Sequence, residues 1–256
     1  GVEQDFNEAI KYYEKSTNQG NSYGINRIGY CYQNGFGVEV DYSKSVEYYE
    51  KGIKLNNPFS INNIGYMYDS GIFFEKNSRK AEEFYLKSAE LGNPDPLINL
   101  GYCYENDKEF NQDINKAIEL YEKAGDLGSS DAFIHLGFLY DQGIKVQQNY
   151  TKSNEYFKKA ADMDNPEGYF SIGLSFLLGK GYEKDFDVAI EMIEKAGKLG
   201  SAEAFNTIGL IYFAGKEVDQ DYETANKYFK KAADLGLASA FYNLGYSYQN
   251  GLGVQQ

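Results

Sequence analysis

Residues 221–254 read DYETANKYFKKAADLGLASAFYNLGYSYQNGLGV, and this stretch is the last copy of a pattern that runs through the whole chain. Each copy opens with Asp or Asn, and successive copies start 36 residues apart. The starts are Asp5, Asp41, Asn77, Asp113, Asn149, Asp185 and Asp221. A fixed period of this length is the signature of a repeat architecture. We therefore expect residues 1–256 to form a single repeat domain of seven units.

Each unit is predicted to contain two helices. The opening Asp or Asn is a good N-cap, because its side chain can accept from free backbone N–H groups. In the second unit, Tyr42, Ser45, Val46 and Tyr49 then follow the i, i+3, i+4, i+7 spacing of one buried helical face. The first helix ends where residues that tolerate a left-handed backbone recur. These residues are Gly20, Asn56, Gly92, Gly128, Asp164, Gly200 and Gly236.

The second helix of each unit carries an internal glycine with an aromatic residue three positions later. Pro58, Pro94 and Pro166 are predicted at its first position, where a missing N–H costs nothing. A glycine ends it in six units, whereas Asp107 predicts a different loop in the third. The internal glycines are Gly29, Gly65, Gly101, Gly137, Gly173, Gly209 and Gly245. A mid-helix glycine costs about 1 kcal/mol against alanine, so we expect it to permit close helix-to-helix approach.

The composition is acidic and gives no sign of a membrane span. A net charge of −13 disfavours nucleic acid and anionic lipid as partners and favours basic protein segments. No apolar run reaches the length that crosses a bilayer. Cys31 and Cys103 hold the same position in units one and three, about 20 Å apart if units stack at about 10 Å, beyond disulfide reach. We therefore expect a cytoplasmic protein, with a secreted or ER-lumenal location left open.

The repeating motif resembles the Sel-one-like repeat family, a relative of the tetratricopeptide repeat. Leu244-Gly245, Tyr248, Gly251, Gly253 and Val254 carry one half of its pattern. The other half lies in the helix before. Its residues are Tyr222, Ala225, Phe229, Lys231, Ala232, Ala233 and Gly236. The resemblance covers the whole chain and implies an all-α, right-handed α-solenoid (superhelix) of seven helix-turn-helix repeats with about 14 helices. It also implies a scaffold or adaptor that binds other proteins without catalysis.

By analogy with tetratricopeptide stacks, the second helices line a concave groove, and asparagine amides with tyrosine rings suit a partner peptide. The predicted partner-binding residues are Asn26, Arg27, Tyr30, Asn62, Asn63, Tyr66, Asn99, Tyr102, His135, Phe138, Leu174, Leu177, Leu178, Asn206, Leu210, Phe213, Asn243 and Tyr246. Two interpretations stay open for the recurring tyrosines among them, namely packing between units and partner contact.

Three groove residues break the repeat pattern. Leu177, Leu178 and Phe213 stand where other units carry polar residues such as Gln33 and Gln249. An apolar patch of this kind can mark a docking site, and local repacking is the alternative. We expect no cofactor, since the single histidine, His135, has no second ligand at metal-binding spacing, and no catalytic constellation is found.

The proposed partner is a protein or peptide segment, with a basic one favoured by charge. Two further hypotheses remain: an architectural, self-assembling subunit, and the regulatory region of a larger enzyme. Gly1-Val2-Glu3-Gln4 and Gly253-Val254-Gln255-Gln256 match the linker between units, which suggests a window of a longer array. Uncapped solenoid ends leave apolar faces open, so end-to-end self-association is also expected.

Overall fold

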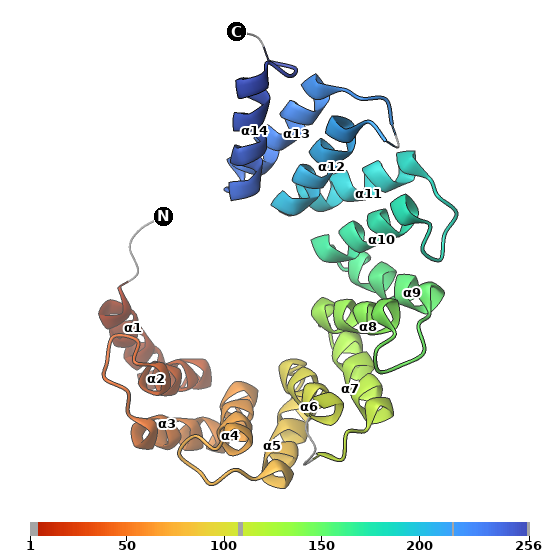
Figure 1. The fold of residues 1–256 in the computed structure, drawn as a ribbon. Coiled ribbons are helices and arrows are strands. Elements are labelled where there is room, and N and C mark those ends of the chain that lie inside the picture. Colours follow the sequence, from red (N-terminus) through yellow and green to blue (C-terminus); the bar gives the residue numbers. More distant parts are fainter. Residues whose placement is uncertain (1–4, 107–109, 217, 255–256) are drawn as a thin grey trace. The chain divides into compact units, whose positions relative to one another are not determined.

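A computed structural model describes residues 5–106, 110–216 and 218–254, and over these residues the chain is all-α. In those residues it forms fourteen α-helices and no strand (Figure 1). This confirms the predicted helical-repeat class and the number of helices. The first seven are α1 (Phe6–Asn18), α2 (Ser22–Asn34), α3 (Tyr42–Lys54), α4 (Pro58–Ser70), α5 (Ser78–Glu90), α6 (Asp95–Asn106) and α7 (Ile114–Asp126). The other seven are α8 (Ser130–Gln142), α9 (Tyr150–Ala161), α10 (Pro166–Leu178), α11 (Phe186–Lys198), α12 (Ala202–Ala214), α13 (Tyr222–Asp234) and α14 (Ala238–Asn250).

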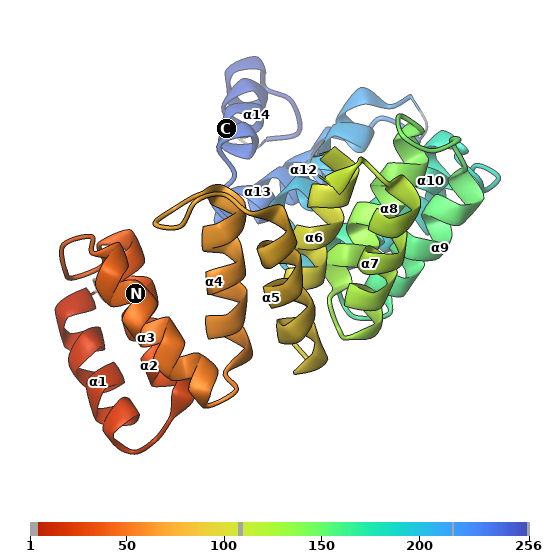
Figure 2. The same ribbon diagram turned by 90° about the horizontal axis from the view of Figure 1, so that it is seen from below.

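The helices group into two compact units. Unit 1 runs from Gly1 to Ser129 and contains α1 to α7, and unit 2 runs from Ser130 to Gln256 and contains α8 to α14. Inside each unit, helices that follow one another in the sequence pack side by side (Figures 1 and 2). The odd-numbered helices are the first helices of the predicted repeats, and the even-numbered ones are the second helices.

The predicted helix starts are confirmed for all seven first helices. Each Asp or Asn adopts an extended backbone and accepts from an N–H group in the first turn, as Asp41 does from Lys44 at 3.0 Å. The same bond forms in unit 2, where the Asp221 carboxylate accepts from the Thr224 N–H at 3.0 Å. These bonds satisfy backbone donors that a helix start leaves without an intrahelical partner. The capping residues thus recur with the 36-residue period of the repeat.

The predicted helix ends are confirmed as well. The residues after the first helices all have positive φ, including the two that are not glycine, Asn56 (53°) and Asp164 (56°). One helix start was predicted wrongly. α6 begins at Asp95, so Pro94 precedes the helix, and the Asn93 side chain accepts from the Asp95 N–H at 3.2 Å. Asp107, on which the prediction of a different third loop rested, lies outside the described residues.

The most extensive packing joins the second helix of one repeat to the first helix of the next. It pairs α2 with α3, α4 with α5 and α6 with α7 in unit 1, and α8 with α9, α10 with α11 and α12 with α13 in unit 2. We call each of these pairs a junction. In every junction the internal glycine faces a large side chain. The facing residues are Tyr49, Tyr85, Tyr121, Phe157, Ile193 and Phe229.

The glycine is required because the facing ring leaves no room for a side chain. A Cβ added at Gly29 would lie 2.7 Å from Cε1 of Tyr49, and one at Gly65 would lie 2.9 Å from Cδ1 of Tyr85. Tyr49 and Tyr85 are fully buried. Burial of such rings stabilises the packed helices. The expected close approach of helices is therefore confirmed, and the approach is between successive repeats.

Candidate functional site

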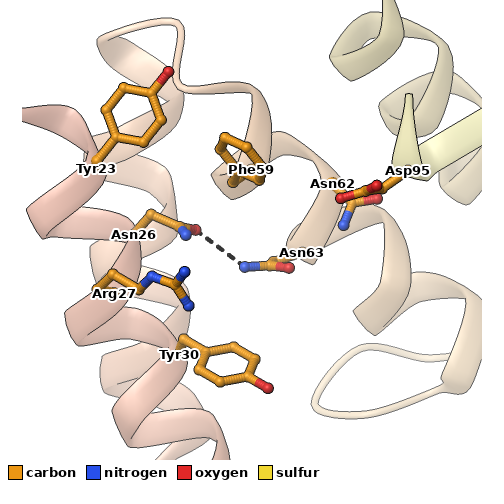
Figure 3. A pocket seen from close by; sticks show the side chains of 8 residues that line it. All are labelled: Tyr23, Asn26, Arg27, Tyr30, Phe59, Asn62, Asn63 and Asp95. Carbon is orange, nitrogen blue, oxygen red and sulfur yellow. Dashed lines mark hydrogen bonds between the residues drawn. The ribbon is translucent and has the colours of Figure 1, made fainter. Parts of the chain in front are cut away.

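The second helices of unit 1 enclose a cleft of about 350 Å³ with a polar lining, which we call the polar cleft (Figure 3). Helix α2 contributes four of its residues, α4 three and the start of α6 one. The lining residues are Tyr23, Asn26, Arg27, Tyr30, Phe59, Asn62, Asn63 and Asp95. Five of them were predicted as partner-binding residues from the sequence, and the structure brings these five together.

Asparagines in the polar cleft bond to each other between repeats. The Asn63 side-chain N–H donates to the Asn26 Oδ1 at 3.0 Å (Figure 3). The Ser60 hydroxyl donates to the same oxygen at 3.3 Å. Unit 2 repeats this bond, with Asn243 donating to Asn206 at 2.9 Å. Asn26 is buried. Asn26 and Asn63 were predicted to bind a partner, but the bond between their amide groups holds adjacent second helices together.

Two charged side chains of the polar cleft remain available. Arg27 and Asp95 are both exposed, and within the described residues neither forms an ion pair. In Figure 3 the Arg27 guanidinium points across the cleft from α2 toward the α4 side, between Asn26 and Tyr30. A guanidinium offers five N–H donors and suits planar acceptors such as a carboxylate or a peptide carbonyl. The polar cleft can therefore hold an extended, polar peptide segment.

The second helices of unit 2 form a cleft of different chemistry, which we call the apolar cleft. It has a volume of about 250 Å³ and lies between α10 and α12. Its lining is Leu177, Leu178, Thr207, Leu210, Ile211, Ala214 and Lys216. Leu178 is 55% exposed and Leu210 is 46% exposed. A second hollow of about 190 Å³ shares Leu210 and continues to α14. It is lined by Leu210, Phe213, Phe229, Tyr242, Asn243 and Tyr246.

The three residues that break the repeat pattern thus line connected surfaces. Leu177 and Leu178 lie in the apolar cleft, Phe213 lies in the adjoining hollow, and Leu210 borders both. The Phe213 ring is 6.1 Å from the Tyr246 ring and 5.0 Å from the Tyr222 ring. Phe213 therefore takes part in local packing, whereas about half of the surface of Leu178 and of Leu210 is exposed to solvent.

The remaining predicted residues lie outside the two clefts. Among the four recurring tyrosines, Tyr66 and Tyr102 are 43% and 61% exposed, and Tyr30 and Tyr246 are 39% and 46% exposed. These values show that none of the four rings is fully buried. Tyr246 still packs against Phe213 of the preceding repeat, so packing between units and partner contact both stay hypotheses for these tyrosines. Phe138 is 37% exposed, with its ring 5.2 Å from Phe157. Asn99 and His135 are half-buried, and Leu174 packs against the buried cluster around Ile193.

Sequence reasoning missed three residues of the polar cleft. Tyr23, Phe59 and Asp95 hold the same position in three successive repeats, one helical turn before the residues that were chosen. Tyr23 is 57% exposed, and its ring lies 5.7 Å from the Phe59 ring. Extending the predicted face by one turn toward the helix start would have included them. Lys216 of the apolar cleft follows α12 and had no comparable signal.

Chemically reactive groups do not converge on either cleft. Burial raises the pKa of the Cys31 thiol, against the opposing charge of Arg27, so the thiol stays protonated near neutral pH. Cys31 and Cys103 are both buried and free of disulfides. A search of the described residues finds no group of three or more His, Cys, Asp or Glu side chains placed to hold a metal ion. Over those residues, every helix is too short or too polar to cross a membrane.

Several known proteins share this architecture. The chain is 26% identical to a Sel1 repeat protein from Oxalobacter formigenes, with a TM-score of 0.69 over 98% of this chain and 74% of that one. It is 29% identical to c5321, a protective antigen of uropathogenic Escherichia coli with an SLR fold, with a TM-score of 0.65. That match covers 98% of this chain and 54% of the antigen, so the chain spans about half of its length. Immunity protein Pa5087 from Pseudomonas aeruginosa shares the fold at 22% identity and a TM-score of 0.55, over 77% of this chain and 76% of that one. A search of curated proteins gave no match.

The family model of the Sel1 repeat matches the chain eight times. The matched segments are 1–21, 22–57, 58–93, 97–129, 131–165, 166–201, 208–237 and 238–256. Most segments begin at or near a second helix and end after the first helix of the next repeat, so one segment spans one junction. Together the matches extend from the first residue to the last. The chain belongs to the Sel1 repeat family.

Proposed function

We propose that this chain is a protein-interaction scaffold whose second helices hold a segment of a partner protein, without catalysis of its own. Sel1-repeat proteins are generally scaffolds for protein–protein interaction. The observation that carries the proposal is the apolar cleft of unit 2. There Leu177 and Leu178 break the repeat pattern, and Leu178 is exposed beside the exposed Leu210.

The exposed side chains of Leu178 and Leu210 can contribute to binding when a partner covers them. Burying a leucine side chain contributes about 1.5–3 kcal/mol, and binding energy concentrates in a few such anchors inside hollows. Leu210 borders two hollows, so a partner side chain placed over it would contact α10, α12 and α14. We infer that the apolar cleft receives one or two large apolar side chains of the partner.

The polar cleft supports the same function by a different mechanism. Arg27 and Asp95 supply unpaired opposite charges, and Tyr23 and Phe59 supply apolar area between them. A partner segment that enters this cleft would be an extended peptide with polar side chains. The net charge of −13 adds a long-range attraction for basic partners. Specificity would then come from the clefts and encounter rate from the net charge.

The test is selection of peptides from a random displayed library on the immobilised chain, followed by affinity measurement on three proteins. These are the wild type, Leu210→Asp, and the matched control Leu199→Asp. Leu199 is a 39% exposed leucine at the end of α11, outside the apolar cleft and the adjoining hollow. All three proteins would first be shown to have equal helicity by circular dichroism.

We expect enriched peptides to carry large apolar residues. We also expect Leu210→Asp to weaken their binding by about tenfold or more, which corresponds to loss of one anchor, while Leu199→Asp leaves it unchanged. Failure to enrich any peptide, or equal weakening by both variants, would refute the apolar cleft as a binding site.

A further inference from the structure

In unit 2 a lysine just after one second helix pairs with a carboxylate of the second helix before it. The Lys180 ammonium, two residues beyond the end of α10, donates to both side-chain oxygens of Asp141 on α8, at 3.0 and 3.1 Å. The same ammonium lies 5.2 Å from the centre of the Tyr150 ring. Lys180 is therefore held by two contacts within its own chain.

The next repeat keeps the lysine but lacks the carboxylate. Lys216 holds the position of Lys180 one period of 36 residues later, and Leu177 holds the position of Asp141. Lys216 is exposed, and within the described residues it forms neither an ion pair nor a cation–π contact. The leucine therefore has two effects: it adds apolar surface, and it leaves Lys216 without the partner that Lys180 has.

This lysine and the exposed leucines line the same hollow. The apolar cleft is bordered by Leu177 and Leu178 of α10, by Leu210 of α12, and by Lys216 beyond the end of α12. Among the described residues that line the cleft, Lys216 is the only one with an ionisable side chain. A cation that lacks a carboxylate thus stands at the edge of an apolar surface.

The carboxylates of the two helices that form the cleft lie at their opposite ends. Glu167 is the second residue of α10, and Glu203 is the second residue of α12. Leu178 ends α10 eleven residues after Glu167, which corresponds to about 16 Å at about 1.5 Å per residue. Neither glutamate can therefore neutralise Lys216 by direct contact.

We propose that the apolar cleft and Lys216 together recognise a partner segment that carries an Asp or Glu side chain beside a large apolar residue. This inference rests on the proposed function and names the chemistry of the segment. The apolar side chain covers Leu178 and Leu210. The carboxylate accepts from Lys216 as the carboxylate of Asp141 accepts from Lys180. Such a pair at the edge of a cleft contributes modestly to affinity and fixes the register of the segment.

The carboxylate is a local requirement and differs from the long-range preference of the whole chain. The net charge of −13 attracts basic partners and repels acidic ones at a distance. Lys216 acts at contact, where it meets one group of the partner. We therefore expect a segment that is neutral or basic overall and has a carboxylate at one fixed position relative to its apolar residue.

Two charge reversals separate the effect of Lys216 from the effect of net charge. Lys216→Glu removes the cation of the cleft. Lys158→Glu is the matched control, because Lys158 is an exposed lysine of α9 that lies outside the apolar cleft and the adjoining hollow. Within the described residues it also forms no ion pair. Both changes lower the net charge by the same amount, and circular dichroism would show equal helicity.

The probes are the peptides that a random displayed library yields on the wild type. Each is synthesised with an amidated C-terminus, so that side chains supply its only carboxylates. A second version of each peptide carries Lys in place of its Asp or Glu. Affinities of both versions would be measured for the wild type, Lys216→Glu and Lys158→Glu.

We expect the enriched peptides to share an Asp or Glu at a fixed spacing from a large apolar residue. Lys216→Glu should weaken their binding about fivefold or more, because an attraction becomes a repulsion. Lys158→Glu should change it less than about twofold. The Lys version of a peptide should bind Lys216→Glu more tightly than it binds the wild type.

Three results would overturn the inference while leaving the apolar cleft as a binding site. They are enriched peptides that share no carboxylate, unchanged binding by Lys216→Glu, and equal weakening by Lys216→Glu and Lys158→Glu. In each case Leu210→Asp would still reduce binding. If no peptide is enriched, or if Leu210→Asp has no specific effect, the proposed function of the cleft fails and this inference fails with it.

Discussion

The glycine of a junction gives the sharpest quantitative prediction, through the pair Gly209→Ala and Gly245→Ala. Both changes place alanine in the middle of a second helix, where it is favoured over glycine by about 1 kcal/mol. At Gly245 this gain stands alone, because nothing lies within 4 Å. Gly245→Ala should therefore raise the free energy of unfolding by up to about 1 kcal/mol.

At Gly209 the added methyl group collides with a neighbouring ring. Its Cβ would lie 2.5 Å from Cδ1 and from Cε1 of Phe229 and 3.1 Å from the Ala225 carbonyl oxygen. Carbon atoms in contact normally lie about 3.5–4.0 Å apart, so the ring has to move by about 1 Å. Phe229 is 1% exposed, so a shift of its ring disturbs the buried packing around it. Overpacking of this kind costs about 1–3 kcal/mol.

Subtracting the gain in helix propensity leaves Gly209→Ala destabilised by up to about 2 kcal/mol. The assay is urea denaturation of both variants beside the wild type, followed by far-ultraviolet circular dichroism at a concentration below any self-association. We expect the midpoint to fall for Gly209→Ala and to rise or stay for Gly245→Ala. A Gly209→Ala protein as stable as the Gly245→Ala protein would refute the reasoning that the glycine exists to admit the ring.

Two further predictions concern buried hydroxyl and carboxyl groups. The Tyr85 hydroxyl is buried without a hydrogen-bond partner, whereas the Tyr121 hydroxyl donates to Glu105 at 2.9 Å. Urea denaturation should therefore show that Tyr85→Phe raises the free energy of unfolding by about 1 kcal/mol and that Tyr121→Phe lowers it by about 1–2 kcal/mol. The opposite order of stabilities would contradict this. Burial, with the nearby charge of Glu203, raises the pKa of Glu167 above its ordinary value of 4.5. The stability of the fold therefore falls as pH rises from about 4.5 through the raised pKa, because Glu167 becomes charged. Thermal unfolding should show a higher melting temperature for Glu167→Gln than for the wild type at pH 7, and no such difference below pH 4.

Local features of this fold were predictable from the sequence, because each depends on residues close together in the chain. Asp41 and Asp221 cap helices through bonds that span three residues. Asn56 and Asp164 end helices because their own backbones tolerate positive φ. The exception is Pro94, which precedes α6 although the equivalent Pro166 begins α10. The local bonds do not account for this difference, because Asn93 and Asn165 both accept from the N–H two residues later.

Contacts between repeats were predictable only in kind. A mid-helix glycine implied a close approach, yet nothing in its local sequence states that the approaching ring lies 20 residues later, as Tyr49 lies after Gly29. The bond from Asn63 to Asn26 likewise joins residues 37 positions apart. The candidate site depends on such contacts, because they decide which exposed side chains remain free for a partner. This is why Asn26 proved to be structural and Leu210 proved to be accessible.

The uniformity of the junctions also has a consequence for the history of the gene. In all six junctions the even-numbered helix offers a glycine to the odd-numbered helix that follows, so these surfaces between adjacent repeats are of one kind. Loss or duplication of 36 residues at equivalent points rejoins two such surfaces and creates no new type of interface. The length of the array can therefore drift by whole repeats under recombination while the core stays compatible, and only the side chains lining the clefts need to be selected afresh.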